Sequence, residues 1–89
     1  MDVIFRIEKD GGIVAVFPYV LWNRYEHTIA CYTHYGQHGA CTWIWARYDT
    51  SPASPDEYKD LLNELYRIGY TDLRVLKRLP SWHTCYEKF

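Results

Sequence analysis

One stretch of eleven residues, Cys31 to Cys41, holds many of the side chains in this chain that are suited to chemistry. It contains two of the four histidines and two of the three cysteines, spaced Cys31-x2-His34-x3-His38-x2-Cys41. Thiolates and imidazoles are the ligands that zinc prefers in proteins. The pattern therefore makes these four residues candidate zinc ligands.

Strand geometry argues against a single metal site in this stretch. Residues an odd number of positions apart on a regular strand point to opposite faces, so Cys31 and His34 converge only if the strand bulges or ends early. Zinc ligands also usually come from two separated knuckles, and this run is more compressed. We therefore predict no cofactor and keep zinc as the alternative, with His83 and Cys85 as further possible ligands.

The same stretch allows acid–base catalysis. His34 and His38 flank Gly36 and Gln37, and two neighbouring imidazoles can act as general acid and base in phosphodiester cleavage. Gln37, or a backbone N–H group of a flanking glycine, can stabilise developing negative charge. His34, Gln37 and His38 are thus the candidate catalytic residues. The alternative is that these side chains hydrogen-bond the turn and orient it.

Thiol chemistry and a Mg²⁺ site are two further possibilities for the same region. Cys31 or Cys41 can act as a nucleophile beside His38, although a cysteine on a strand usually behaves as a small buried hydrophobe. No Asp or Glu occurs from Thr28 to Tyr48, which argues against a carboxylate-bound Mg²⁺ there.

Aromatic and basic residues raise the question of nucleic-acid binding. Trp43, Trp45 and Arg47 share one face of a predicted strand and can stack bases. Basic residues near the end of the chain can meet phosphates: Arg74, Lys77 and Arg78. A formal net charge of -1 argues against a nucleic-acid partner, and packing of the two tryptophans in a core or dimer is the simpler explanation.

Four strands are predicted in the first half of the chain. Their bounds are Asp2–Glu8, Ile13–Phe17, Thr28–Tyr35 and Cys41–Tyr48. Alternating apolar residues or β-branched and aromatic content supports each of them. Asp10-Gly11-Gly12 predicts a tight turn, and Pro18 is expected to end the second strand. We expect a surface loop over Tyr19–His27, a turn over Gly36–Gly39 and a polar crossing over Asp49–Ala53.

A helix is predicted over Pro55–Ile68. Ser54 and Glu57 form a capping box around Pro55, and Gly69 is the expected stop. Apolar residues at helical spacing predict the buried stripe: Tyr58, Leu61, Leu62, Leu65 and Ile68. A last strand is expected over Leu73–Leu79, and the aromatic tail Ser81–Phe89 is expected to pack on the body.

These elements predict a single α+β domain over residues 1–89. The order is β-β-β-β-α-β, with an antiparallel sheet and one helix packed on one face. The composition, 48% hydrophobic and 24% charged, is that of a folded globular chain. Since one helix covers one face, the other face is wet, covered by the tail and the Tyr19–His27 loop, or covered by a partner. The 18% aromatic content favours a protein partner or a homodimer.

Cysteine usage and hydropathy predict a compartment. Three cysteines cannot all be paired within one chain, no secretory pattern is visible, and no apolar run is long enough to span a membrane. We therefore expect a cytoplasmic protein with reduced thiols and no membrane contact.

Several short motifs resemble a family of small bacterial proteins. The segment Y-x-H-x-G-Q-H over Tyr32–His38, followed by a helix that ends in Ile68-Gly69-Tyr70, is similar to proteins often encoded on phages and mobile elements. The resemblance covers most of the chain and implies the fold and a mobile-element origin. It implies no activity, and Cys41 lies outside the pattern.

We predict a protein-binding module that is not an enzyme and acts through an aromatic sheet face and the 34–39 turn. The candidate binding residues are Tyr32, His34, Gln37, His38, Trp43, Trp45 and Arg47. The alternative is a small His- or zinc-dependent phosphodiesterase or nuclease that uses His34 and His38.

Overall fold

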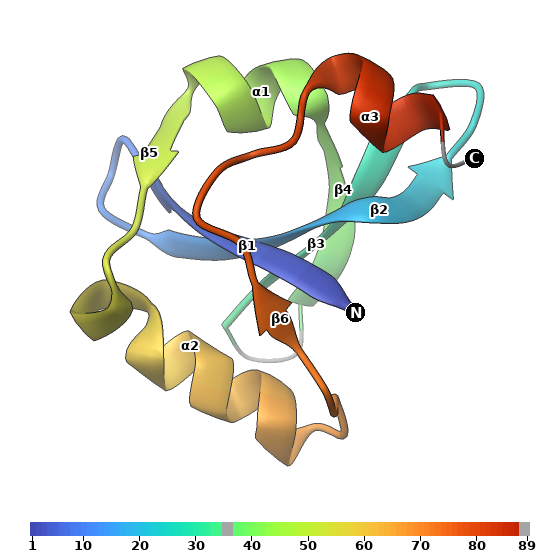
Figure 1. The fold of residues 1–89 in the computed structure, drawn as a ribbon. Helices are drawn as coiled ribbons and strands as arrows, with labels where there is room; N and C mark the ends of the chain where they lie inside the picture. Colours follow the sequence, from blue (N-terminus) through green and yellow to red (C-terminus); the bar gives the residue numbers. More distant parts are fainter. Residues whose placement is uncertain (35–36, 88–89) are drawn as a thin grey trace.

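The predicted α+β fold is confirmed. A computed structural model describes residues 1–34 and 37–87 and shows a mostly antiparallel sheet with helices packed on it (Figure 1). The strands are β1 (Asp2–Glu8), β2 (Ile13–Asn23), β3 (Thr28–Thr33), β4 (Gln37–Thr42), β5 (Thr50–Pro52) and β6 (Arg74–Val75). The helices are α1 (Trp43–Tyr48), α2 (Pro55–Arg67) and α3 (Trp82–Glu87).

The sheet is built around β1. Its order is β4-β3-β2-β1-β5, and β6 also pairs with β1. β5 runs antiparallel to the second half of β1, with Arg6 opposite Pro52, whereas β6 runs parallel to the first half, with Asp2 opposite Arg74. The predicted last strand, Leu73–Leu79, was therefore too long. Beyond Val75 the chain leaves the sheet, and Leu76 and Leu79 pack against buried residues.

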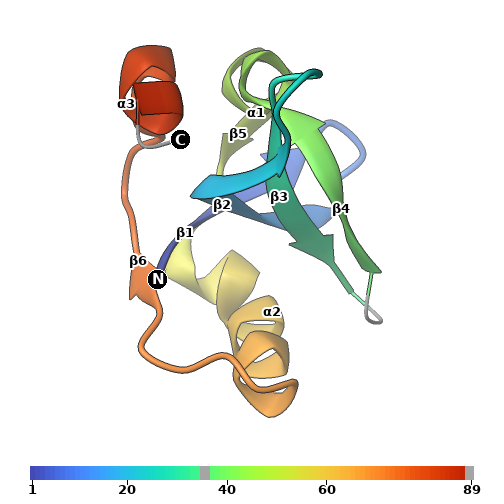
Figure 2. The same ribbon diagram turned by 90° about the vertical axis from the view of Figure 1, so that its right-hand side faces the viewer.

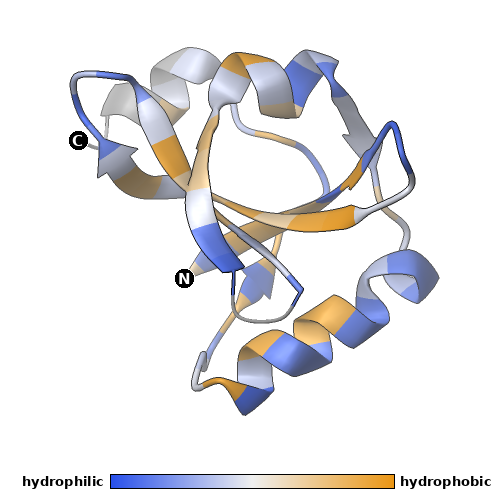
Figure 3. Ribbon diagram, turned by 180° about the vertical axis from the view of Figure 1, so that it is seen from behind, coloured by the Kyte–Doolittle hydropathy of each residue, from blue (hydrophilic) through white to orange (hydrophobic). Residues whose placement is uncertain are grey.

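Each face of the sheet has its own hydrophobic cluster. The α2 face joins residues of the first three strands to α2: Val3, Phe5, Ala15, Phe17, Ala30, Tyr32, Leu61 and Leu65. The α1 face joins the opposite side of the sheet to α1: Ile4, Val14, Val16, Ile29, Cys41 and Ala46. Figures 2 and 3 show α1 and α2 on different sides of the strands, and hydrophobic positions concentrated in the central strands and recurring along α2.

The prediction of a strand over Cys41–Tyr48 was wrong. β4 begins at Gln37 and ends at Thr42, and a six-residue helix, α1, follows. The hydroxyl of Thr42 accepts a hydrogen bond from the backbone N–H of Trp45 at 3.1 Å, which caps the new helix. Over only six residues, the pattern of apolar and polar residues does not distinguish a strand from a short capped helix. In the structure these residues form a helix, and Ala46 is its buried residue.

The predicted end of the second strand at Pro18 was also wrong, and so was the loop over Tyr19–His27. β2 continues to Asn23, and its pairing with β3 shifts register between Phe17 and Leu21. Proline donates no backbone hydrogen bond, so it is tolerated in a strand where such an irregularity interrupts the ladder. Only a short turn then remains before β3.

The β3–β4 connection is shorter than predicted. β3 ends at Thr33 and β4 already includes Gln37, His38 and Gly39, so Gly39 pairs with Cys31 within the ladder. The predicted strand end at Tyr35, the turn glycine Gly36 and the tail residue Phe89 lie outside the described residues. The predicted polar crossing contains β5, which extends the sheet beside β1.

The main helix, α2, follows the prediction closely. Ser54 and Glu57 form the expected capping box, and Gly69 follows the helix with a φ of 117° that glycine tolerates. Leu61 and Leu65 are buried, but the predicted stripe residue Ile68 is exposed because the helix ends at Arg67. In the predicted tail, Cys85 is fully buried in α3, whereas the aromatic side chain of Trp82 is 41% exposed.

Candidate functional site

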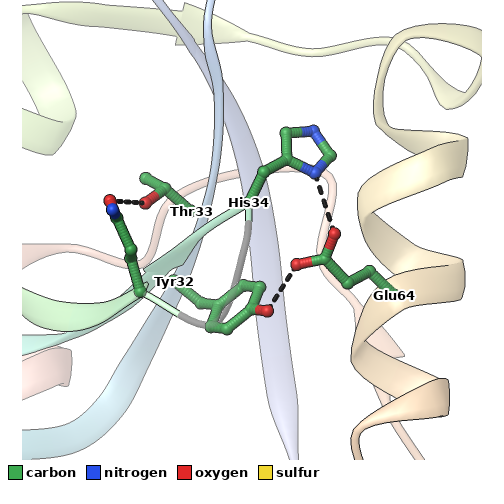
Figure 4. Close-up of polar contacts among 5 residues, drawn as sticks. Tyr32, Thr33, His34 and Glu64 are labelled. Atoms are coloured by element: carbon green, nitrogen blue, oxygen red, sulfur yellow. Dashed lines mark hydrogen bonds and ion pairs between the residues drawn. The ribbon is translucent and has the colours of Figure 1, made fainter.

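A carboxylate from α2 meets the polar end of the β3–β4 hairpin (Figure 4). Nδ1 of His34 lies 3.0 Å from Oε1 of Glu64, and the hydroxyl of buried Tyr32 donates a hydrogen bond to Oε2 of the same carboxylate. The Glu64 side chain is 19% exposed and the His34 side chain 42%. The two hairpin side chains therefore share one partly buried acceptor.

The second histidine has a different partner. Nε2 of His38 lies 2.8 Å from the hydroxyl of Tyr70, which follows the end of α2. The His38 ring meets the ring of Tyr32, opposite it in the sheet, edge to face at 4.7 Å between centroids. Burial raises the pKa of Tyr70, so its hydroxyl stays protonated at neutral pH. His38 is exposed, so its imidazole is reachable by solvent.

Each predicted catalytic side chain thus contacts a different residue. Gln37 accepts a hydrogen bond from Thr33 Oγ1 at 3.3 Å, while the two histidines reach Glu64 and Tyr70. The contacts of these side chains accordingly extend to Glu64 and Tyr70, which the sequence reasoning had not assigned to this site. The available signal was spacing: Glu64 follows buried Leu61 by three residues and so borders the buried stripe of α2.

The four candidate zinc ligands do not converge. Cys31 and Cys41 lie on the α1 face, where their thiols hydrogen-bond each other, whereas His34 and His38 contact residues of the α2 side. The cause is the alternation of the strands, since Cys31 pairs with Gly39 and its neighbour Tyr32 pairs with His38. Among the described residues, no group of three or more His, Cys, Asp or Glu is placed to hold a metal ion.

The thiols have distinct environments. The hydrogen bond from Cys41 lowers the pKa of Cys31, and the same bond together with burial raises the pKa of Cys41. Burial raises the pKa of Cys85 to about 11. The strand geometry does not place His38 beside Cys31 or Cys41 to activate a thiol nucleophile, because the two cysteines and His38 point to opposite faces of the sheet. The side chain of His83 lies outside the described part of the chain.

The predicted aromatic binding face does not form. Trp43, Trp45 and Arg47 lie on α1, where Trp43 Nε1 donates to the carbonyl of Pro80 at 2.7 Å and Trp45 packs against the α1 face. The Arg47 guanidinium lies 5.3 Å from the ring centre of Tyr48. Since α1 covers the second sheet face, the open apolar face expected from a single helix is closed.

A different apolar surface lies where α1, α3 and the β2–β3 turn meet. A groove of about 320 Å³ is lined by Glu26, His27, Thr42, Trp43, Ile44 and Trp82. The Ile44 side chain is 61% exposed and Trp82 is 41% exposed. On α1, Tyr48 is exposed one turn after Ile44. The sequence reasoning missed this surface because it treated residues 43–48 as a strand.

Among the described residues, no helix is long and apolar enough to cross a membrane. A comparison with protein-family models gave no match. Comparisons with curated proteins and with solved structures gave none either. The resemblance to small phage and mobile-element proteins therefore stays a prediction.

Proposed function

We propose that this protein is a protein-binding module whose contact surface is the groove between α1 and α3. The observation that carries the proposal is the exposure of Ile44 and Trp82 at the two sides of that groove. Large apolar side chains that stay exposed around a hollow mark interaction sites, and tryptophan is enriched among residues that dominate binding energy. The surface replaces the sheet face expected from the sequence.

The proposed occupant is a short segment of a partner protein with an aliphatic anchor beside a basic residue. The apolar part of the lining, formed by Trp43, Ile44 and Trp82, suits an aliphatic side chain. Glu26, exposed in the β2–β3 turn, supplies negative charge at the rim and favours a neighbouring lysine or arginine. The hairpin end at His34 and His38 is a second partly exposed polar surface, at the opposite end of β3 and β4 from the groove.

The test combines capture with direct binding. Immobilised protein is used to capture partners from lysate, and the purified partner is then titrated by calorimetry against wild type, Ile44→Ser and Trp82→Ala. Both variants should weaken binding by about tenfold or more if these residues anchor the contact. Tyr66→Ala is the matched control, because Tyr66 is an exposed aromatic on α2. Equal affinity of Ile44→Ser and wild type would refute the assignment, as would the absence of any captured partner.

A homodimer stays a prediction. It rested on the surplus of aromatic side chains; α1 covers the second sheet face, so the apolar surface that supports a dimer is the same groove. Light scattering at micromolar concentration tests it, and a species of only 10.7 kDa would contradict it. Cytoplasmic location and a mobile-element origin are also proposals, and the free cysteines Cys31, Cys41 and Cys85 support a reducing compartment.

One contact favours a second function from another class, a histidine-dependent phosphodiesterase. Glu64 stands 3.0 Å from Nδ1 of His34, and a carboxylate in that position orients an imidazole for general base catalysis. Hydrolysis of bis(p-nitrophenyl) phosphate should then fall by about 10²–10⁴-fold in His34→Ala. His27→Ala is the control, since His27 is exposed in the β2–β3 turn. No activity above background in wild type would remove this candidate.

A further inference from the structure

A small cavity beside β1 is lined mostly by cationic side chains. Its volume is about 230 Å³, and its lining residues are Arg6, Arg47, Pro52, Lys77, Arg78 and Leu79. Four of the six carry a positive charge, and they come from β1, α1 and the segment that follows β6. No acid lines the cavity among the described residues. In a chain of net charge -1, this is a local concentration of positive charge that folding assembles.

Arg6 is the buried member of this group. It is only 5% exposed, although arginine keeps its charge at any physiological pH. Its Nε donates to Thr50 Oγ1 and one terminal nitrogen donates to the Thr50 carbonyl, both at 2.9 Å. Burial, and then the charge of Arg47, lower the pKa of Arg6, so both effects work against a cation at this place.

Among the described residues, neither the acids of β1 nor Asp49 forms an ion pair with Arg6. Asp49 pairs with Lys9 at 3.4 Å, and Asp2 pairs with Arg74 at 3.1 Å. Glu8, two residues along β1, lines a separate hollow together with Lys9 and Asp49. Within the described part of the chain, no ion pair compensates Arg6. A buried charge normally has an ionic partner, because removing it from water is costly.

The contacts with Thr50 explain only part of this arrangement. They tie β1 to β5 and to the end of α1, since Thr50 Oγ1 also donates to the Ala46 carbonyl at 2.5 Å. That structural role accounts for two donors of Arg6. It does not account for three more cations around the same hollow, where like charges repel one another.

We propose that this cavity binds the phosphoryl group of a small phosphate monoester. Guanidinium groups match phosphate oxygens through paired N–H donors, and a lysine adds a point charge, so the lining suits a dianion. Pro52 and Leu79 supply the apolar part of the wall, which suits the carbon atoms next to a phosphate. A concave site of this size fits a terminal phosphate better than the backbone of a nucleic acid, which runs along extended basic surfaces.

The test uses inorganic phosphate, 5′-AMP and adenosine as probes in an NMR titration. Shifts of the Arg6 Nε–H signal report directly on the cavity, because this group is fixed by its bond to Thr50. Phosphate and 5′-AMP should both shift it saturably, and adenosine should not. Lys77→Gln and Arg78→Gln should each raise the dissociation constant for 5′-AMP by about tenfold to a hundredfold, as expected for loss of a charged hydrogen bond.

The controls separate a built site from general attraction. Lys59→Gln and Arg67→Gln remove exposed cations from α2 and should leave the affinity unchanged. Lys77 and Arg78 are exposed, so the Lys77→Gln and Arg78→Gln proteins should fold. Substitution of the buried Arg6, as in Arg6→Met, is not needed for the test. Equal weakening by the α2 variants, or equal binding of adenosine and 5′-AMP, would overturn the proposal. Tighter binding of oligothymidine than of 5′-AMP, lost in the same cavity variants, would overturn the monoester assignment in favour of single-stranded nucleic acid.

Discussion

The two helices that cover opposite faces of the sheet are specified in different ways. α2 has its start and stop signals in its own sequence: Ser54, Pro55, Glu57 and Gly69. α1 has one N-terminal cap, Thr42, and its remaining support comes from residues outside the helix, both near and distant in sequence. Its last turn contacts Thr50, and Trp43 donates to Pro80, 37 residues away in sequence. Local signals make a helix readable in a sequence, whereas tertiary contacts make it visible only in the fold.

The largest effect is expected from removal of a side chain in the core beneath α2. Leu65 is fully buried in the α2 face, so Leu65→Ala should lower the free energy of unfolding by about 2–5 kcal/mol. Urea melts measure this change. Leu62→Ala, at a half-buried position of the same helix, should cost less. A cost below about 1 kcal/mol at Leu65 would contradict its place in the core.

The second largest effect is expected under α1. Thr50→Val keeps the shape of the side chain but removes the hydroxyl that accepts from Arg6 and donates to Ala46. The free energy of unfolding should fall by about 1–3 kcal/mol, because buried donors and acceptors then lack partners. Hydrogen exchange should show the loss concentrated in α1. Thr71→Val, at an exposed position, is the control and should change little.

Removing the caps compares the two helices directly. Ser54→Ala and Thr42→Ala should each cost about 1 kcal/mol of stability. The distribution should differ: without Ser54, α2 should fray only in its first turn, whereas without Thr42 the whole six-residue α1 should lose protection from hydrogen exchange. Protection retained throughout α1 in Thr42→Ala would show that its tertiary contacts suffice alone.

The smallest effect is a pH dependence confined to α2. Hydrogen bonds with the Ser54 backbone and side chain lower the pKa of Glu57 below its ordinary value of 4.5. A lowered folded-state pKa gives stability that is present above the ordinary value and is lost as pH falls through the folded value. Glu57→Gln keeps a capping amide without a titrating group, so its stability should depend less on acid in urea melts between neutral pH and pH 3. If the free energy of unfolding falls equally with acid in the wild type and in Glu57→Gln, this role of Glu57 is contradicted.

What the sequence could predict follows the same division. The first hairpin and α2 were predicted because glycines, a proline and a capping box fix them locally. The prediction of a strand over residues 41–48 was wrong because the six residues of α1 are too few for the apolar pattern to distinguish a strand from a helix. Continuation of β2 past Pro18 depends on an irregularity in its pairing with β3, which no local pattern announces.

The candidate sites show the limit more clearly. His34 and His38 were singled out by type and spacing, but their partners Glu64 and Tyr70 lie about thirty residues away and meet them only after α2 docks. Arg6 lies in a strand predicted from alternating apolar residues, and its burial depends on β5 lying beside it. Side chains that could do chemistry are visible in a sequence; the pairs that they form are set by topology.

The shared edge of β1 has a consequence for synthesis of the chain. During synthesis β1 and β2 emerge before β5 and β6. The free edge of β1 is therefore covered only after β5 and β6 have been made, and Arg74, the partner of Asp2, follows it by 72 residues. Until then an apolar strand near the N-terminus offers unpaired backbone groups to any neighbouring nascent chain. β5 and β6 thus protect β1 from aggregation once they pair with it. This protection depends on when the two strands are synthesised as well as on how strongly they pair.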